Sequence, residues 1–155
     1  MNPVPEPKLQ HLYQEVILDH NKRPRNFRAL EPPSQKAEGF NPLCGDRITV
    51  YLRLNGDRIE DLSFEGSGCA ISKASASLMT AALKGRTLSE ADSLFQEFHH
   101  MVTAPADTPI ETGQLDKLVV FAGVREYPVR VKCASLAWHT LRAALEAKQD
   151  VVSTE

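Results

Sequence analysis

The sequence lacks a long apolar run, a charge excess and a leader-like N-terminus, and each absence excludes a class of protein. Its 155 residues carry 18 basic and 20 acidic side chains, so the net charge of −2 gives no electrostatic case for nucleic-acid binding. The longest strongly apolar run, LVVFAGV, is too short to span a bilayer. The opening MNPVPEPK has no basic segment leading into an apolar stretch, which argues against a secretory signal. We therefore expect a cytoplasmic protein without nucleic-acid or membrane partners.

Cysteine is also scarce, and the chain has no CxxC pair. Three cysteines are an odd number, and a reducing compartment disfavours disulfides, so a disulfide framework is not expected. Free cysteines are often small buried hydrophobes, which is one interpretation of all three. A phosphate loop and a Ser/His/Asp hydrolase signature are absent as well. The positions of the cysteines in the predicted elements are therefore the main guide to any chemical function.

The hydrophobic pattern predicts one α+β domain over residues 9–147, with a flexible lead at 1–8 and a flexible tail at 148–155. Apolar residues at helical spacing predict a helix from Leu9 that ends before Pro24. Alternation on both sides of Asn55–Asp57 predicts a hairpin, although Ile59 is out of phase. Further helices are expected over 71–85, from about 89 to 102, and from about Cys133 onward. The expected architecture is a small antiparallel three-stranded sheet with helices packed on it.

Four basic residues crowd the segment after the first helix: Lys22, Arg23, Arg25 and Arg28. A solvated loop is one interpretation of this cluster, and a docking surface for an acidic partner is the other.

Two side chains of the last helix also need an assignment. Trp138 is either a packing residue or a partner contact, and His139, six residues after Cys133, should face away from that cysteine.

Each cysteine falls at a junction between predicted elements. Cys44 lies in a loop just before a strand, Cys69 follows a glycine-rich turn and begins a helix, and Cys133 is expected to begin the last helix after an extended stretch. A helix start stabilises an anion, so Cys69 and Cys133 are placed to be thiolates. Gly45 allows a tight turn that lets Cys44 and Asp46 face one point.

If these side chains converge, the donor set is Cys44, Asp46, Cys69 and Cys133. Three sulfurs and one oxygen suit Zn²⁺, and they could also hold an iron–sulfur cluster. The spacing matches no zinc-finger pattern. The carboxylate indicates an exchangeable position, which favours a site that reacts or releases its ligand.

Three segments together carry a resemblance to a known family. They are LYQEVILDHNKRPRNF, the stretch from CGDRITV through GSGCAISKASAS to GRTLSEA, and VKCASLAWHTLRAAL. On these motifs the chain resembles the U-type iron–sulfur cluster assembly proteins, the IscU/SufU family. The resemblance implies a compact α+β domain with Cys44, Asp46, Cys69 and Cys133 grouped at one tip.

Departures from the IscU type favour the SufU type. Lys132 stands where IscU-type scaffolds have a histidine, EYPVRVK matches their Leu-Pro-Pro-Val-Lys motif weakly, and the connection between Cys69 and Cys133 is longer. The SufU type implies a zinc-bound sulfur acceptor for a pyridoxal-phosphate-dependent SufS-type cysteine desulfurase. We expect Cys44 to be the acceptor, because it lies on a loop rather than at a helix start. Downstream partners would be a SUF scaffold or apo iron–sulfur proteins. We further expect Arg130 and Lys132, alternating in an extended stretch, to share one side near Cys133 and to hold the partner or offset the negative charge of the site.

Three hypotheses remain from the sequence. The first is the zinc-dependent sulfurtransferase, and the second is a scaffold that assembles and transfers a [2Fe–2S] cluster on Cys44, Asp46, Cys69 and Cys133. The third is a non-catalytic domain in which zinc only stabilises the fold. A chain with this many apolar helical faces should not need such a metal to fold.

Overall fold

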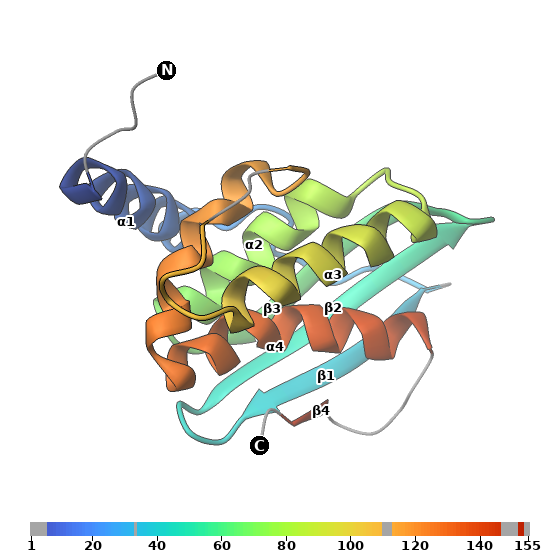
Figure 1. The fold of residues 1–155 in the computed structure, drawn as a ribbon. Helices are drawn as coiled ribbons and strands as arrows, with labels where there is room; N and C mark the ends of the chain where they lie inside the picture. The colour runs from blue at the N-terminus through green and yellow to red at the C-terminus, as the bar shows by residue number, and fades with distance from the viewer. Residues whose placement is uncertain (1–5, 33, 110–112, 147–151, 154–155) are drawn as a thin grey trace.

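The sheet carries the site at one of its ends. In the computed structural model, which describes residues 6–32, 34–109, 113–146 and 152–153, β1 (Gln35–Asn41), β2 (Asp46–Asn55) and β3 (Arg58–Ser67) form an antiparallel meander. A two-residue strand, β4 (Val152–Ser153), pairs in parallel with β1 and gives the order β3-β2-β1-β4. The predicted three-stranded antiparallel sheet is confirmed, and β4 is a small addition to its edge (Figure 1).

A β-bulge explains why Ile59 is out of phase with the strand alternation. Arg53 pairs with Asp61 and Leu54 pairs with Ile59, so Glu60 is an extra residue on β3. The extra residue shifts the pleat by one position, and Ile59 is fully buried as a result. The sheet therefore keeps one apolar face along its whole length.

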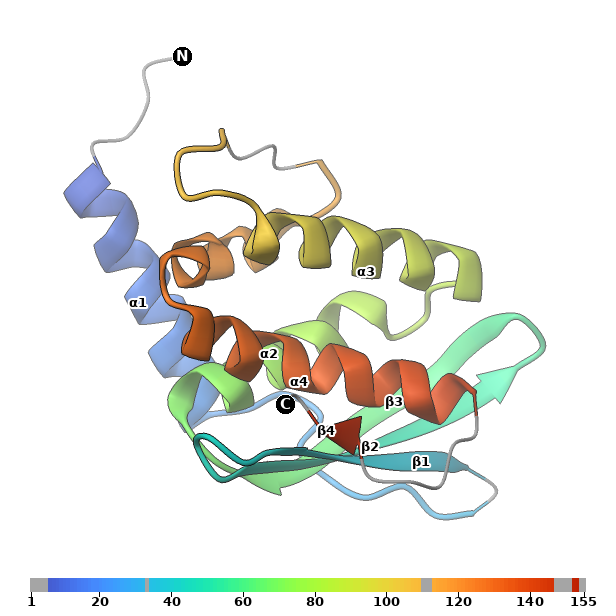
Figure 2. The same cartoon turned by 60° about the horizontal axis from the view of Figure 1, so that its bottom comes forward.

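The helices form two layers above that apolar face. α2 (Ala70–Leu83) and α4 (Pro128–Leu145) pack on the sheet, while α3 (Leu88–Thr103) and the 3₁₀ helix η1 (Asp116–Glu126) pack above them. Figure 2 shows this order, with the sheet seen nearly edge-on below α4 and α3 furthest from it. Gly39 on β1 lets α4 approach closely, because a Cβ there would collide with the Thr140 hydroxyl.

The last helix begins earlier than the sequence indicated. α4 begins at Pro128, and the apolar stretch before it is the 3₁₀ helix η1, so the extended stretch expected before Cys133 is wrong. The alternation of Val129 with Val131 was too short to distinguish a strand from a helix. Proline suits the first turn of a helix, and residues from Cys133 onward bury one continuous face against the sheet and α2.

The same helix settles the role of Trp138. Its side chain is 1% exposed, its ring stacks on Phe98 with centroids 4.5 Å apart, and its indole N–H donates to Ser75 Oγ at 3.2 Å. Trp138 is therefore a packing residue. His139 lies against Phe95 and His99.

The N-terminal helix begins before the position expected from its apolar residues. α1 (Glu6–Lys22) includes three residues that the sequence assigned to a flexible lead, and the remainder of that lead lies outside the described residues. Most of the predicted tail also lies outside them, apart from β4. Among the helices that the structure describes, none combines the length and apolar character needed to cross a membrane.

Candidate metal and sulfur-acceptor site

A tight turn between β1 and β2 presents the first two candidate residues. The Asn41 carbonyl accepts hydrogen bonds from the amides of Cys44 (3.3 Å) and Gly45 (2.8 Å). Gly45 has φ +72°, a conformation that side chains other than glycine's adopt only with strain. The turn leaves Cys44 exposed at its tip and puts Asp46, fully buried, at the first position of β2.

Asp46 then anchors Cys69, which lies where β3 leads into α2. Asp46 Oδ1 accepts the Cys69 backbone N–H at 2.7 Å, and the Cys69 thiol donates to Asp46 Oδ2 at 3.7 Å. Cys69 is the N-cap of α2, and its sulfur accepts the Ser72 N–H at 3.4 Å, as predicted for a residue at a helix start. Gly68 permits the close approach, because a Cβ there would collide with the Asp46 carboxylate.

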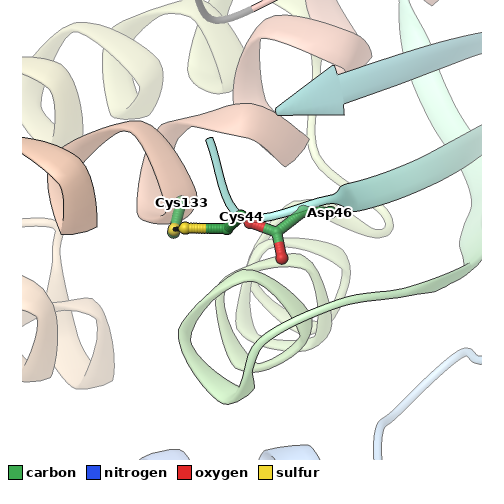
Figure 3. Close-up of side chains that lie close together, drawn as sticks. All are labelled: Cys44, Asp46 and Cys133. Atoms are coloured by element: carbon green, nitrogen blue, oxygen red, sulfur yellow. Dashed lines mark hydrogen bonds between the residues drawn. The ribbon is translucent and has the colours of Figure 1, made fainter. Parts of the chain in front are cut away.

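Cys133 reaches the same point from α4. It is 2% exposed, and its thiol donates to Cys44 Sγ across 3.4 Å (Figure 3). It is the sixth residue of α4 rather than the first, so the predicted helix-start environment for this thiol is wrong. The structure thus brings the four sequence-predicted ligands together, and among them only Cys44 is exposed.

The spacing of three donor atoms fits one shared metal ion, and the fourth lies beside them. Two sulfurs bound tetrahedrally to one Zn²⁺ at about 2.3 Å lie roughly 3.5–4 Å apart. The ligand atoms of Cys44, Asp46 and Cys133 lie within 4.8 Å of one another, and Cys69 Sγ lies 3.7 Å from Asp46 Oδ2. Three soft sulfurs and one carboxylate oxygen are a donor set that zinc accepts.

The environment of the two less exposed thiols opposes their ionisation in the absence of a cation. Burial raises the pKa of Cys69, even though the Ser72 N–H favours its thiolate. Burial also raises the pKa of Cys133, and the neighbouring Cys44 and Cys69 sulfurs raise it further. The expectation that helix starts alone would make both residues thiolates is therefore not met, and a bound cation would have to supply the missing stabilisation.

Asn41 is a site residue that the sequence analysis did not identify. It is fully buried, and its amide Nδ2 donates to Asp46 Oδ2 at 3.2 Å and to Cys133 Sγ at 3.3 Å. Its Oδ1 accepts the Leu43 N–H at 3.3 Å, so one side chain connects the turn, the carboxylate and the distant thiol. The available signal was the Asn-Pro pair that ends a strand just before the Cys-Gly-Asp motif.

A shallow groove borders the thiols. Its lining includes the three cysteines and, beside them, Ile71 and residues 126–130. Arg130 belongs to this lining, and its guanidinium lies 4.5 Å from the centre of the Tyr127 ring. The expectation that Arg130 and Lys132 share one side is wrong, because both lie in α4, where residues two apart point about 200° apart.

The basic cluster after α1 is partly neutralised within the protein. Arg25 pairs with Asp19 at 2.7 Å, and Arg28 donates to both oxygens of Asp61 at 2.9 and 3.0 Å. The Arg25 backbone N–H and His20 Nδ1 both bond Ser77 Oγ, at 2.8 and 2.7 Å, which holds this segment to α2. These bonds give much of the basic cluster a structural role.

Comparison with known proteins agrees with the fold. The family model of the NifU-like N-terminal domain matches residues 12–134. The chain is 43% identical to the zinc-dependent sulfurtransferase SufU of Bacillus subtilis, covering 92% of this chain and 94% of that protein. It is 40% identical to the iron–sulfur cluster assembly scaffold protein IscU of Streptococcus pyogenes, with 90% and 86% covered.

A solved structure shows the same relationship at the level of the fold. The crystal structure of FiSufU from Fervidobacterium islandicum AW-1 matches with a TM-score of 0.78 and 36% identity, over 87% of this chain and 98% of that one. The family match, the two relatives and this fold agree on one assignment. The chain belongs to the family of the NifU-like N-terminal domain, the IscU/SufU family.

Proposed function

We propose that the protein is a zinc-bound sulfur acceptor that takes persulfide sulfur onto Cys44 from a SufS-type cysteine desulfurase. The observation that carries this proposal is the asymmetry of burial in the donor set. Asp46 and Cys133 are buried and Cys69 is half-buried, whereas Cys44 lies exposed at the tip of a turn. One ligand can therefore leave and meet a partner while three stay anchored. The name of the Bacillus subtilis relative points the same way.

Cys44, Asp46, Cys69 and Cys133 would hold the zinc ion. When bound, zinc supplies the positive charge that keeps thiols deprotonated at neutral pH. Asn41 orients two of these ligands by donating to Asp46 and to Cys133. A carboxylate ligand keeps one bond of the site exchangeable, in keeping with a site that must open during each transfer.

The transfer step is a thiol exchange. The Cys44 thiolate attacks the terminal sulfur of the desulfurase persulfide, and a new bond forms between Cys44 Sγ and that sulfur. The bond between the terminal sulfur and the desulfurase cysteine breaks, and its electron pair stays on the desulfurase as a thiolate. Cys44 then carries the persulfide, with no net oxidation or reduction.

The rim of the groove offers a surface for the desulfurase. Leu43, Tyr127 and Val129 are 56%, 49% and 48% exposed, and all three flank site residues. Arg130, stacked on Tyr127, adds a cation at this rim and would pair with a carboxylate of the desulfurase or offset the negative charge of the site. Lys132 is half-buried outside the groove lining, so we keep the partner-binding role for Arg130 alone.

The test measures alanine production by a SufS-type desulfurase under reducing conditions. The protein is added as purified, after removal of metal by a chelator, and after return of zinc. We expect stimulation that disappears with the metal and returns with it. Cys44→Ala should abolish stimulation, whereas Ser67→Ala, an exposed change beside the site, should not. Normal sulfur transfer by Cys44→Ala would overturn the assignment.

A second candidate function is a scaffold that assembles a [2Fe–2S] cluster and passes it on. The three converging thiols and one carboxylate could hold such a cargo, and the Streptococcus pyogenes relative is named a scaffold. Anaerobic reconstitution with iron and sulfide discriminates the two functions. Stable cluster absorbance, enhanced in Asp46→Ala by slower release, would support the scaffold. A colourless, zinc-filled protein that cannot be reconstituted would exclude it.

The cell compartment and the next acceptor follow from the same chemistry. An exposed Cys44 thiol is kept reduced in the cytoplasm, so we propose that the protein works there. The sulfur would pass from Cys44 to a SUF scaffold or to apo iron–sulfur proteins. Labelled sulfur traced from the loaded protein to a purified scaffold would test this step.

A further inference from the structure

The proposed acceptor sulfur is in contact with a second thiol of the same chain. Cys44 Sγ and Cys133 Sγ lie 3.4 Å apart, although 89 residues separate them in the sequence. Cys133 is 2% exposed, so its sulfur meets Cys44 rather than thiols in solution. Figure 3 shows the two sulfur atoms pointing toward each other, with the Asp46 carboxylate to one side.

From this contact, and resting on the proposed function, we infer that Cys133 is a resolving thiol for the Cys44 persulfide. Cys133 Sγ attacks Cys44 Sγ, and a Cys44–Cys133 disulfide forms. The bond between Cys44 Sγ and the terminal sulfur breaks, and the terminal sulfur leaves with the electron pair as hydrosulfide, which takes up the proton that the Cys133 thiol gives up. The transferred sulfur is reduced by two electrons and the two cysteines are oxidised by two, so the step needs no other oxidant.

The geometry around the pair permits this step. A disulfide needs sulfurs about 2.05 Å apart, so they must approach by roughly 1.4 Å. Cys44 lies exposed on a turn, and rotation of its side chain can supply that movement, while α4 holds Cys133 in place. Asn41 Nδ2 lies 3.3 Å from Cys133 Sγ and points a donor at the sulfur that must carry negative charge as it attacks.

Cys69 is less suited to the same role. Its thiol donates to Asp46 Oδ2 and its sulfur accepts the Ser72 N–H, so its contacts point toward the carboxylate and the α2 terminus. Its ligand atom also lies outside the group formed by Cys44, Asp46 and Cys133. A disulfide from Cys44 to Cys69 is therefore not expected.

The consequence is that metal occupancy decides the fate of the sulfur. A Cys133 sulfur that is coordinated to metal is not free to attack, so the persulfide stays on Cys44 for the next acceptor. With Cys133 free, the protein releases hydrosulfide once and then closes its own acceptor thiol in a disulfide. Only a reductant returns that form to use.

The experiment starts from zinc-bound protein that the desulfurase has loaded with sulfur from cysteine. After removal of small thiols by desalting, one half is treated with chelator and the other is kept in buffer. Released sulfide is assayed colorimetrically, and intact mass and non-reducing peptide maps follow the persulfide and the disulfide. We expect close to one sulfide per Cys44 persulfide after chelation, together with a linked Cys44–Cys133 peptide, and no release in buffer.

A variant tests Cys133 directly. Ser67→Ala, an exposed change outside the ligand set, should release sulfide after chelation as the wild type does, whereas Cys133→Ser should keep its Cys44 persulfide. The wild-type peptide map decides the question even if a variant fails to fold or load. A Cys44 persulfide that survives chelation, or a disulfide from Cys44 to Cys69, overturns the inference and leaves the proposed function standing. Absence of any Cys44 persulfide in the loaded zinc protein overturns the proposed function itself.

Discussion

Asn41→Ala is the sharpest test of how the site is built, because one amide serves two ligands. The change removes the donor to Asp46 Oδ2 at 3.2 Å and the donor to Cys133 Sγ at 3.3 Å, both in a fully buried position. A buried hydrogen bond to a charged group contributes about 1.5–3 kcal/mol. Loss of a hydrogen bond that a neighbouring residue makes to a metal ligand typically lowers metal affinity by about 10–100-fold. We therefore expect zinc affinity to fall by one to two orders of magnitude, equivalent to roughly 1.4–2.8 kcal/mol.

The assay is a competition titration with a chromophoric zinc chelator, accompanied by urea unfolding of the metal-free protein. Asn55→Ala, at the exposed end of the β2–β3 hairpin, is the control and should bind zinc as the wild type does. Asn41→Asp should be worse than Asn41→Ala, because it puts a second carboxylate beside Asp46. Wild-type zinc affinity in Asn41→Ala would refute the argument that Asn41 orients the ligands.

Three further predictions follow from burial and close contact. Gly39→Ala should destabilise the fold by about 1–3 kcal/mol in urea unfolding, because its Cβ would collide with a hydroxyl of α4, whereas Gly123→Ala, in open space, should not. Zinc binding should release at least two protons, from the two thiols whose pKa values burial raises, so affinity should rise with pH. Calorimetry in buffers of different ionisation enthalpy checks the proton count, and release of fewer than one would contradict it. Burial lowers the pKa of His20 below its usual 6.5, so its stabilising effect should be complete above that pH and be lost as pH falls below it. His20→Gln should flatten that part of the stability profile, and the exposed His100→Gln should leave it unchanged.

Much of the site could be predicted because Cys44, Asp46 and Cys69 each lie in or next to a local turn. Cys44, Gly45 and Asp46 lie in one tight turn, where a glycine with positive φ is needed. Cys69 follows a glycine-rich turn and caps a helix, a position with a recognisable sequence pattern. These arrangements depend on backbone preferences over a few residues, and such preferences are written in the local sequence.

The mistakes concern segments whose conformation depends on distant packing. The alternation of Val129 and Val131 suits a strand or a helix equally, and the burial of α4 against the sheet and α2 decided for a helix. Arg130 and Lys132 diverge for that reason. Asn41 was missed because its role depends on Cys133, which lies 92 residues away in the sequence. Ile59 is in phase only once the bulge on β3 is known.

By itself, then, the sequence determined the antiparallel sheet, most of the helices, the family resemblance and the identity of the four candidate ligands. The tertiary structure alone decided that Cys44 is exposed while Asp46 and Cys133 are buried, and that Cys133 Sγ lies 3.4 Å from Cys44 Sγ. Burial and contact between residues far apart in the chain arise from how the sheet and α4 pack together. That packing cannot be predicted from the conformational preferences of single residues or short segments.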